Sequence, residues 1–157
     1  YFFRARRDEL NAVIINNNQN KKDISQLEEA YQLIESELGI PALRLEYVPQ
    51  GLVLQEVTQK ENSITVQFYY EGNVVFLYEG KGMDNISFGI ESDRSQGKSV
   101  YNERLNQYVE YFENNLEDGS VEYETILTID KNVYYFSGIL PEEEYIKIIK
   151  FFLIKVS

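Results

Sequence analysis

The chain contains no histidine and no cysteine, and each absence removes a class of chemistry. Without histidine, the usual general base near neutral pH and the commonest metal ligand are missing. Without cysteine, there is no thiol nucleophile, no thiolate zinc site and no disulfide. A chain without disulfides fits both the reducing cytoplasm and an extracytoplasmic bacterial protein that needs none. We therefore expect neither a cofactor nor a bound metal.

Basic residues and long apolar runs are also scarce. Fifteen Lys and Arg stand against 26 Asp and Glu, so the formal net charge is −11. This charge argues against nucleic acid as a partner, since affinity for phosphates comes from basic side chains. No run is long enough to span a membrane. Because the chain begins at Tyr1 and its only methionine is Met83, we expect a piece of a longer protein whose N-terminal membrane anchor is absent.

The composition that remains is that of a folded domain: 43% of the 157 residues are hydrophobic and 14% are aromatic. We divide the chain into residues 1–22, a juxtamembrane stalk with an Asn-rich linker, and residues 23–157, a single α+β domain. The stalk carries three aromatic residues and a basic patch at Arg4, Arg6 and Arg7. It is either a helix packed on the domain or the end of a lost transmembrane segment.

A helix is predicted from Asp23 onward. Asp23 and Gln26 form a capping-box pattern, and apolar residues follow at helical spacing: Ile24, Leu27, Tyr31, Ile34 and Leu38. Gly39 and Pro41 end it.

Alternating apolar and polar residues then predict strands at Leu52–Thr58, Ser63–Glu71 and Asn73–Tyr78. A turn is expected at Pro49-Gln50-Gly51, and a hairpin turn at Gly72-Asn73. A weaker strand is predicted over residues 86–90. The segment Tyr101–Leu116 fits a helix or an edge strand, and the pattern does not decide between them.

The last third of the chain has the clearest pattern. Val121–Ile129 and Val133–Ser137 alternate like paired strands around a turn, and Pro141 opens an acidic first helical turn. The buried face of this helix is expected to comprise Tyr145, Ile148, Ile149 and Phe152. The whole pattern predicts an α+β fold, an antiparallel meander sheet packed by an N-terminal and a C-terminal helix on one face.

Motifs that carry chemistry are weak. Residues 92–99 end like a phosphate-binding loop, but Ser92 stands where the first glycine is needed, so we predict a plain loop. Acidic residues cluster in one region: Glu110, Glu113, Glu117, Asp118, Glu122, Glu124 and Asp130. We interpret this cluster as a solvated strand face. Weak cation binding and carboxylate catalysis are the alternatives.

Tyrosine is abundant, with 13 residues. Several lie on predicted strands, where alternation points some of them away from the core. A possible ligand face consists of Tyr69, Tyr78 and Tyr134, because exposed aromatic rings stack on sugars or anchor peptides. Cross-strand packing is the structural alternative.

Three segments together resemble a known family. They are the helix end and turn over residues 29–51, the hairpin Ser63–Tyr78, and the strand and helix over residues 133–150. Their order and spacing are similar to an uncharacterised DUF4367-like domain family of clostridia and other Gram-positive bacteria. The resemblance implies a domain placed after one transmembrane helix, often in anti-sigma-factor-like or sporulation-associated proteins. It implies no catalytic residue.

These observations favour a non-enzymatic, extracytoplasmic sensing or binding domain of a membrane-anchored bacterial signalling protein. Its partner is expected to be an unidentified cell-wall, peptide or protein ligand. The first alternative is a structural or protein-interaction scaffold without a small ligand. The second is a hydrolase built on carboxylates.

Overall fold

Alternating and helical patterns in the sequence become strands and helices across most of the chain. The computed structural model describes residues 18–82 and 97–155. Their elements, in chain order, are α1 (Asn18–Leu33), the π-helical turn η1 (Ile34–Leu38), β1 (Leu43–Leu45), β2 (Leu52–Gln59), β3 (Ser63–Tyr70), β4 (Asn73–Gly80), β5 (Lys98–Asn102), β6 (Gln107–Asn115), β7 (Val121–Ile129), β8 (Asn132–Gly138), α2 (Glu142–Lys150) and β9 (Phe152–Ile154). The α+β class and the antiparallel pairing are as predicted. The weaker strand expected over residues 86–90 lies outside the described residues.

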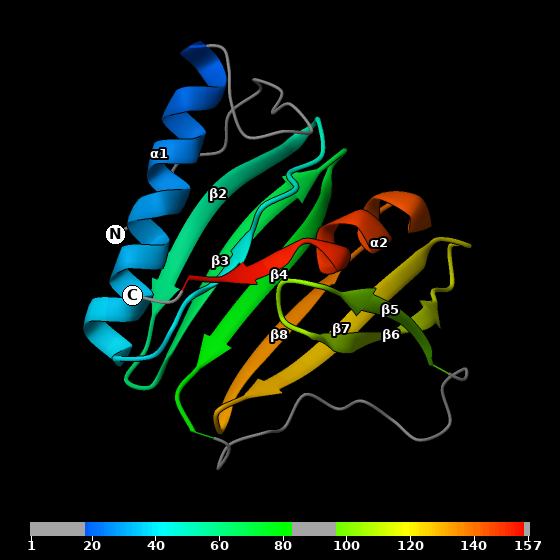
Figure 1. Cartoon of the computed structure of the whole chain (residues 1–157). Helices are drawn as coiled ribbons and strands as arrows, with labels where there is room; N and C mark the ends of the chain where they lie inside the picture. Colours follow the sequence, from blue (N-terminus) through cyan, green and yellow to red (C-terminus); the bar gives the residue numbers. More distant parts are fainter. Residues whose placement is uncertain (1–17, 83–96, 156–157) are drawn as a thin grey trace.

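The main sheet is not one continuous meander. Its seven strands run in the order β2-β3-β4-β8-β7-β6-β5, so β4 pairs with β8 and not with β5 (Figure 1). Two runs of consecutive strands, β2–β4 and β5–β8, therefore meet at the β4–β8 pair. This pair brings Leu77 opposite Phe136, and both are almost fully buried. The long-range pairing thus joins two strongly apolar strands in the middle of the sheet.

The ambiguous segment after residue 100 forms a β-hairpin, β5–β6. The buried side chains of Val109 and Tyr111 alternate with exposed Tyr108 and Glu110, which is the period of a strand and not of a helix. The first half of β6 pairs with β5 and its second half, from Phe112, pairs with β7. The hairpin therefore bends away from the sheet and packs beside α2 (Figure 1).

The first helix starts earlier than predicted and ends where predicted. It begins at Asn18, so part of the expected linker is helical and Asp23 lies inside the helix. The capping preference of Asp23 is a small local energy, which the longer helix overrides. Leu27, Tyr31, Ile34 and Leu38 are buried, as expected for one helical face. Gly39, with φ +70°, ends the helical turn in the left-handed region.

A short two-stranded ribbon, β1 with β9, lies across the buried side of the sheet and anchors it to α1. The N–H of Leu43 donates to Oε1 of Glu79 on β4 at 2.8 Å. The N–H of Leu45 donates to the hydroxyl of Tyr31 on α1, also at 2.8 Å. The hydroxyl of Tyr134 on β8 donates to the carbonyl oxygen of Pro41 at 2.7 Å. One short segment is thus held by a helix and by the two central strands.

Arg44, in the middle of β1, ties the same ribbon to the outer side of α1. Its guanidinium contacts Glu28 at 2.9 Å and Glu35 at 3.4 Å. It also lies 4.9 Å from the centroid of the Tyr31 ring, within cation–π range. Because the Arg44 side chain is 9% exposed, these contacts are less screened than those of a surface ion pair. They fix the position of α1 relative to β1.

The second helix carries an aromatic core. Tyr145, Ile148 and Ile149 are fully buried, as predicted, whereas Phe152 belongs to β9 and is buried there. The Tyr145 hydroxyl hydrogen-bonds the Phe136 carbonyl oxygen and the Thr125 hydroxyl, both at 2.9 Å. Its ring is surrounded at centroid distances of 5.2 to 5.8 Å by the rings of Tyr111, Tyr123 and Phe136. These contacts fix the helix rigidly on the sheet.

The C-terminal end of α2 is capped by a side chain from β5. Asn102 is fully buried, and its Nδ2 donates to the carbonyl oxygens of Ile149 at 2.9 Å and Phe152 at 3.0 Å. Its Oδ1 accepts the N–H of Leu105 at 2.8 Å. Helix-end carbonyls need such partners when water cannot reach them.

We expect Asn102→Ala to lower the free energy of unfolding by roughly 2 kcal/mol, because it leaves buried carbonyl groups without their donor. Urea denaturation measures this loss. Asn115→Ala is the control, since Asn115 is exposed at the end of β6 and its change should cost less than about 0.5 kcal/mol. Equal losses for the two variants would show that Asn102 is not a structural cap.

Glu79 predicts an unusual dependence of stability on pH. Its side chain is fully buried, and burial raises its pKa well above the ordinary value, against the opposing effects of the Leu43 N–H and Arg44. Its Oε2 makes no hydrogen bond to any described residue. The folded state therefore retains a proton that the unfolded state releases near pH 4.5. Above that pH, stability falls with rising pH until the folded-state pKa is passed, with a slope approaching about 1.4 kcal/mol per pH unit.

Glu79→Gln keeps an oxygen for the Leu43 N–H and removes the titration. We expect the variant to be more stable than the parent protein at pH 8, and to lose the falling limb in urea denaturation between pH 5 and 8. Glu61→Gln, at an exposed position, should leave the parent slope intact. Parallel pH profiles for Glu79→Gln and the parent would contradict the assignment.

Candidate functional site

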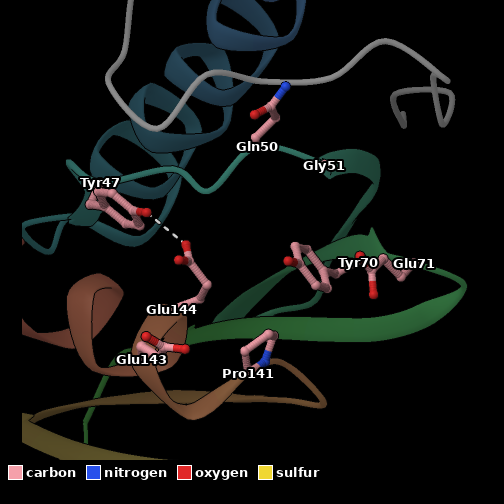
Figure 2. Close-up of a pocket in the computed structure, with 8 residues that line it drawn as sticks. All are labelled: Tyr47, Gln50, Gly51, Tyr70, Glu71, Pro141, Glu143 and Glu144. Carbon is pink, nitrogen blue, oxygen red and sulfur yellow. Dashed lines mark hydrogen bonds between the residues drawn. The ribbon is translucent and has the colours of Figure 1, made fainter.

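A pocket of about 680 Å³ opens at one end of the sheet. Its lining comes from three segments that are far apart in the sequence: Tyr47, Gln50, Gly51, Tyr70, Glu71, Pro141, Glu143 and Glu144 (Figure 2). The volume lies in the range of pockets that hold small organic ligands. The first segment follows β1, the second is the end of the β3–β4 hairpin, and the third is the start of α2.

Two tight turns give the pocket its walls. In the first, the N–H of Leu52 donates to the Pro49 carbonyl oxygen at 3.1 Å, and Gly51 has φ +93°. This is the predicted turn, and its glycine adopts the positive φ that a type II turn requires. In the second, Glu71 and Gly72 both have positive φ, and Asn73 pairs with Tyr70. The hairpin turn is thus Glu71-Gly72, one residue before the expected position.

The third wall is the first turn of α2. Pro141 precedes the helix with φ −57°, and its carbonyl oxygen accepts the N–H groups of Glu144 and Tyr145 at 3.0 Å. Tyr145 is locked in the core, so the adjacent residues Glu143 and Glu144 are presented to the pocket on a fixed backbone. Rigid support of this kind makes a site precise.

Tyr47 and Glu144 form a hydrogen bond across the pocket wall. The Tyr47 hydroxyl donates to Glu144 Oε1 at 2.6 Å (Figure 2). Burial, and then this bond and the charge of Glu144, raise the pKa of Tyr47 to about 12. The phenol therefore stays protonated at physiological pH. Lys147 Nζ lies beside the pair, 3.9 Å from Glu144 Oε2 and 5.5 Å from the centroid of the Tyr47 ring.

Tyr70 is the more buried of the two tyrosines that line the pocket. It is 9% exposed, and its hydroxyl points into the pocket (Figure 2). Among the described residues, none forms a hydrogen bond with this hydroxyl, whose pKa is raised by burial and by the charges of Glu71 and Glu144. Because this hydroxyl is the end of a largely buried ring that opens on the pocket, its hydrogen bonds go to water or to a bound molecule. Tyr70 is thus a donor and acceptor available to a bound molecule.

The predicted tyrosine face is not one face. Tyr134 is 1% exposed and lies opposite Glu79, on the side covered by the β1–β9 ribbon. Tyr69 and Tyr78 lie on the opposite side of the sheet and are half-buried. There Tyr78 is paired with Thr65 and Tyr135. Tyr134 is therefore excluded from any ligand face, because its hydroxyl holds the Pro41 carbonyl oxygen.

The acidic cluster divides between two environments. Glu124, predicted to be solvated, is 4% exposed and accepts hydrogen bonds from Asn114 Nδ2 and the Tyr135 hydroxyl, both at 2.6 Å. Glu113 pairs with Lys98 at 2.9 Å. In the part of the chain that the structure describes, no group of three or more acidic side chains is arranged to hold a metal ion. Lys98 and Ser99, at the end of the phosphate-loop-like motif, lie in β5 and precede no helix.

Sequence reasoning did not single out this pocket as a site. Gly51 and Pro141 carry local signals for a turn and for a helix start, but no local signal shows that they converge with Tyr47. Tyr70 lies on the buried side of β3, and its position at the end of the strand opens its hydroxyl to the pocket.

Comparisons with known proteins found no family model, no curated protein and no solved structure that matches this chain. Over residues 18–82 and 97–155, no helix is both long enough and apolar enough to cross a lipid bilayer.

Proposed function

We propose that this chain is a non-enzymatic ligand-binding domain and that the pocket between Tyr47, Tyr70 and Glu144 is its binding site. The observation that carries the proposal is Tyr70, which is 9% exposed and whose hydroxyl is directed into the pocket, without a partner among the described residues. Two aromatic rings and several polar groups that converge on a concavity of this size are typical of small-ligand sites.

The proposed place of the domain is outside the cytoplasm, on a membrane-anchored bacterial signalling protein. The resemblance to the DUF4367-like family supports this placement, and the aromatic residues Tyr1, Phe2 and Phe3 are of the kind found at membrane interfaces. The two predicted helices, packed on the sheet with the ribbon, would then form the rigid body that presents the pocket.

The path from the pocket to α1 supports a sensing role. Tyr47 lies two residues after Leu45, whose N–H is held by Tyr31 on α1. Arg44 joins the same strand to Glu28 and Glu35 on that helix. A ligand that displaces Tyr47 would change the contacts between β1 and α1 and so shift the preferred position of α1. This helix is the described element nearest to the expected anchor.

A protein-interaction role is the second candidate, and one observation favours it. Tyr101 and Tyr108 face each other across the β5–β6 hairpin, with ring centroids 5.1 Å apart, and they are 40% and 67% exposed. Paired exposed tyrosines are common at protein interfaces. This surface lies on a different hairpin from the pocket walls, so variants can separate the two roles.

The pocket is tested by NMR titration with cell-wall fragments, short peptides and small amines. We expect a binding ligand to shift the backbone amides of Gly51, Glu71 and Glu144. Tyr70→Phe should weaken its binding about five- to tenfold, the value of one hydrogen bond to a neutral group. Tyr69→Phe is the matched control, since it makes the same change on the opposite face of the same strand.

Three results would count against the proposal. Shifts confined to Tyr101 and Tyr108 would move the function to the interaction surface. Equal losses for Tyr69→Phe and Tyr70→Phe would remove the pocket as the site. Conversion of the bound ligand into a product would overturn the non-enzymatic assignment and favour the carboxylate hydrolase.

A further inference from the structure

We propose that the pocket recognises an alkylammonium group, as carried by a lysine side chain or a small free amine. The inference rests on the proposed function and names the class of ligand. It is drawn from the charge of the lining, from the neighbouring lysine and from the polar groups left open inside the pocket.

The lining carries carboxylates and no basic side chain. Glu71 lies in the β3–β4 turn and Glu143 and Glu144 lie in α2, and no lysine or arginine is among the lining residues that the structure describes. Neither Glu71 nor Glu143 forms an ion pair with a described residue. The N-terminus of α2 adds a partial positive charge, but three glutamates in its first turn outweigh it. An anionic ligand would be repelled, whereas a cation is attracted.

Lys147 shows that one wall of the pocket already accommodates an ammonium group. Its Nζ lies over the Tyr47 ring and near Glu144 Oε2. An aromatic face combined with a carboxylate is the environment that alkylammonium groups prefer. Lys147 is not among the described lining residues. Glu71 and Glu143 do line the pocket, and neither forms an ion pair with a described residue.

Tyr70 supplies the neutral acceptor that an ammonium group also needs. An ammonium has three donors and no acceptor, so it is best held by several oxygens. The ring of Tyr70 is largely buried, and its hydroxyl points into the pocket and forms no hydrogen bond to a described residue. Its oxygen is therefore open for an N–H donor, with carboxylates on either side at Glu71 and Glu144.

The size and walls of the pocket favour an organic cation over a metal ion. About 680 Å³ is far more than a bare ion fills. No metal-binding group is formed by the described residues. Pro141 and the two tyrosine rings supply apolar surface for an alkyl chain (Figure 2).

The test compares a blocked lysine, N-acetyl-lysine methylamide, with its neutral counterpart N-acetyl-norleucine methylamide, by NMR titration and calorimetry at low and high salt. We expect the lysine probe to shift the amides of Glu71 and Glu144, with an affinity that falls as salt rises. The norleucine probe should bind at least about tenfold more weakly, because it lacks the charge. Butylamine and a lysine-containing tripeptide then distinguish a free amine from a peptide side chain as the source.

The test variant combines Glu71→Gln and Glu143→Gln in one protein. The charge-matched control combines Glu61→Gln and Glu110→Gln, at exposed positions that do not line the pocket. The pocket pair should weaken lysine binding at least about tenfold, and the control pair should not. Equal binding of the lysine and norleucine probes, or no effect of the pocket pair, would overturn the ammonium assignment. If a ligand without an amine shifts the pocket amides, the binding function stands and only the ligand class fails. If no probe shifts them, both proposals fail.

Discussion

The hydrogen bond between the Leu43 N–H and the buried carboxyl of Glu79 is the contact on which the placement of the β1–β9 ribbon over the sheet depends. It crosses from the ribbon to the central strand β4, in a place that water does not reach. Around it, Tyr31, Arg44 and Tyr134 attach the same short segment to α1 and β8. A buried acid is costly, but once protonated it holds the ribbon in one register against the sheet. Without this register, neither α1 nor Tyr47 would have a defined position.

The second helix, α2, connects the aromatic core to the pocket. Tyr145 sits in a cluster of aromatic rings, and the glutamate before it faces the pocket. The Tyr145 hydroxyl holds α2 near its start, and Asn102 holds its C-terminal end. The first turn of α2 therefore cannot shift without disturbing the core. The pocket thus has one wall fixed on the sheet through α2 and another, at Tyr47, fixed through the ribbon.

Local patterns were sufficient for much of the fold. The alternation in β3 and β7, the glycine after η1 and the proline before α2 have causes within a few residues, and the structure agrees with them. The β4–β8 pairing has no such local cause, since it depends on which strands bury the most apolar surface together. Alternation also separates Tyr134 from Tyr135 without saying which side the ribbon covers. The burial of Glu79 could not be predicted, because charged residues are seldom fully buried. The pocket could not be predicted because its walls come from segments that are far apart in the sequence.

The pairing of β1 with β9 sets an order of events during synthesis. In the described part of the chain, β1 has β9 as its strand partner in the ribbon, so an early segment must wait for a late one. During synthesis, strands β2 to β8 are therefore made before β9, and until β9 follows, β1 lacks its partner in the ribbon. Contacts so distant in sequence form slowly, because a long loop must close first. The wall of the pocket at Tyr47 therefore depends on the last described strand, although that strand contributes no residue to the lining.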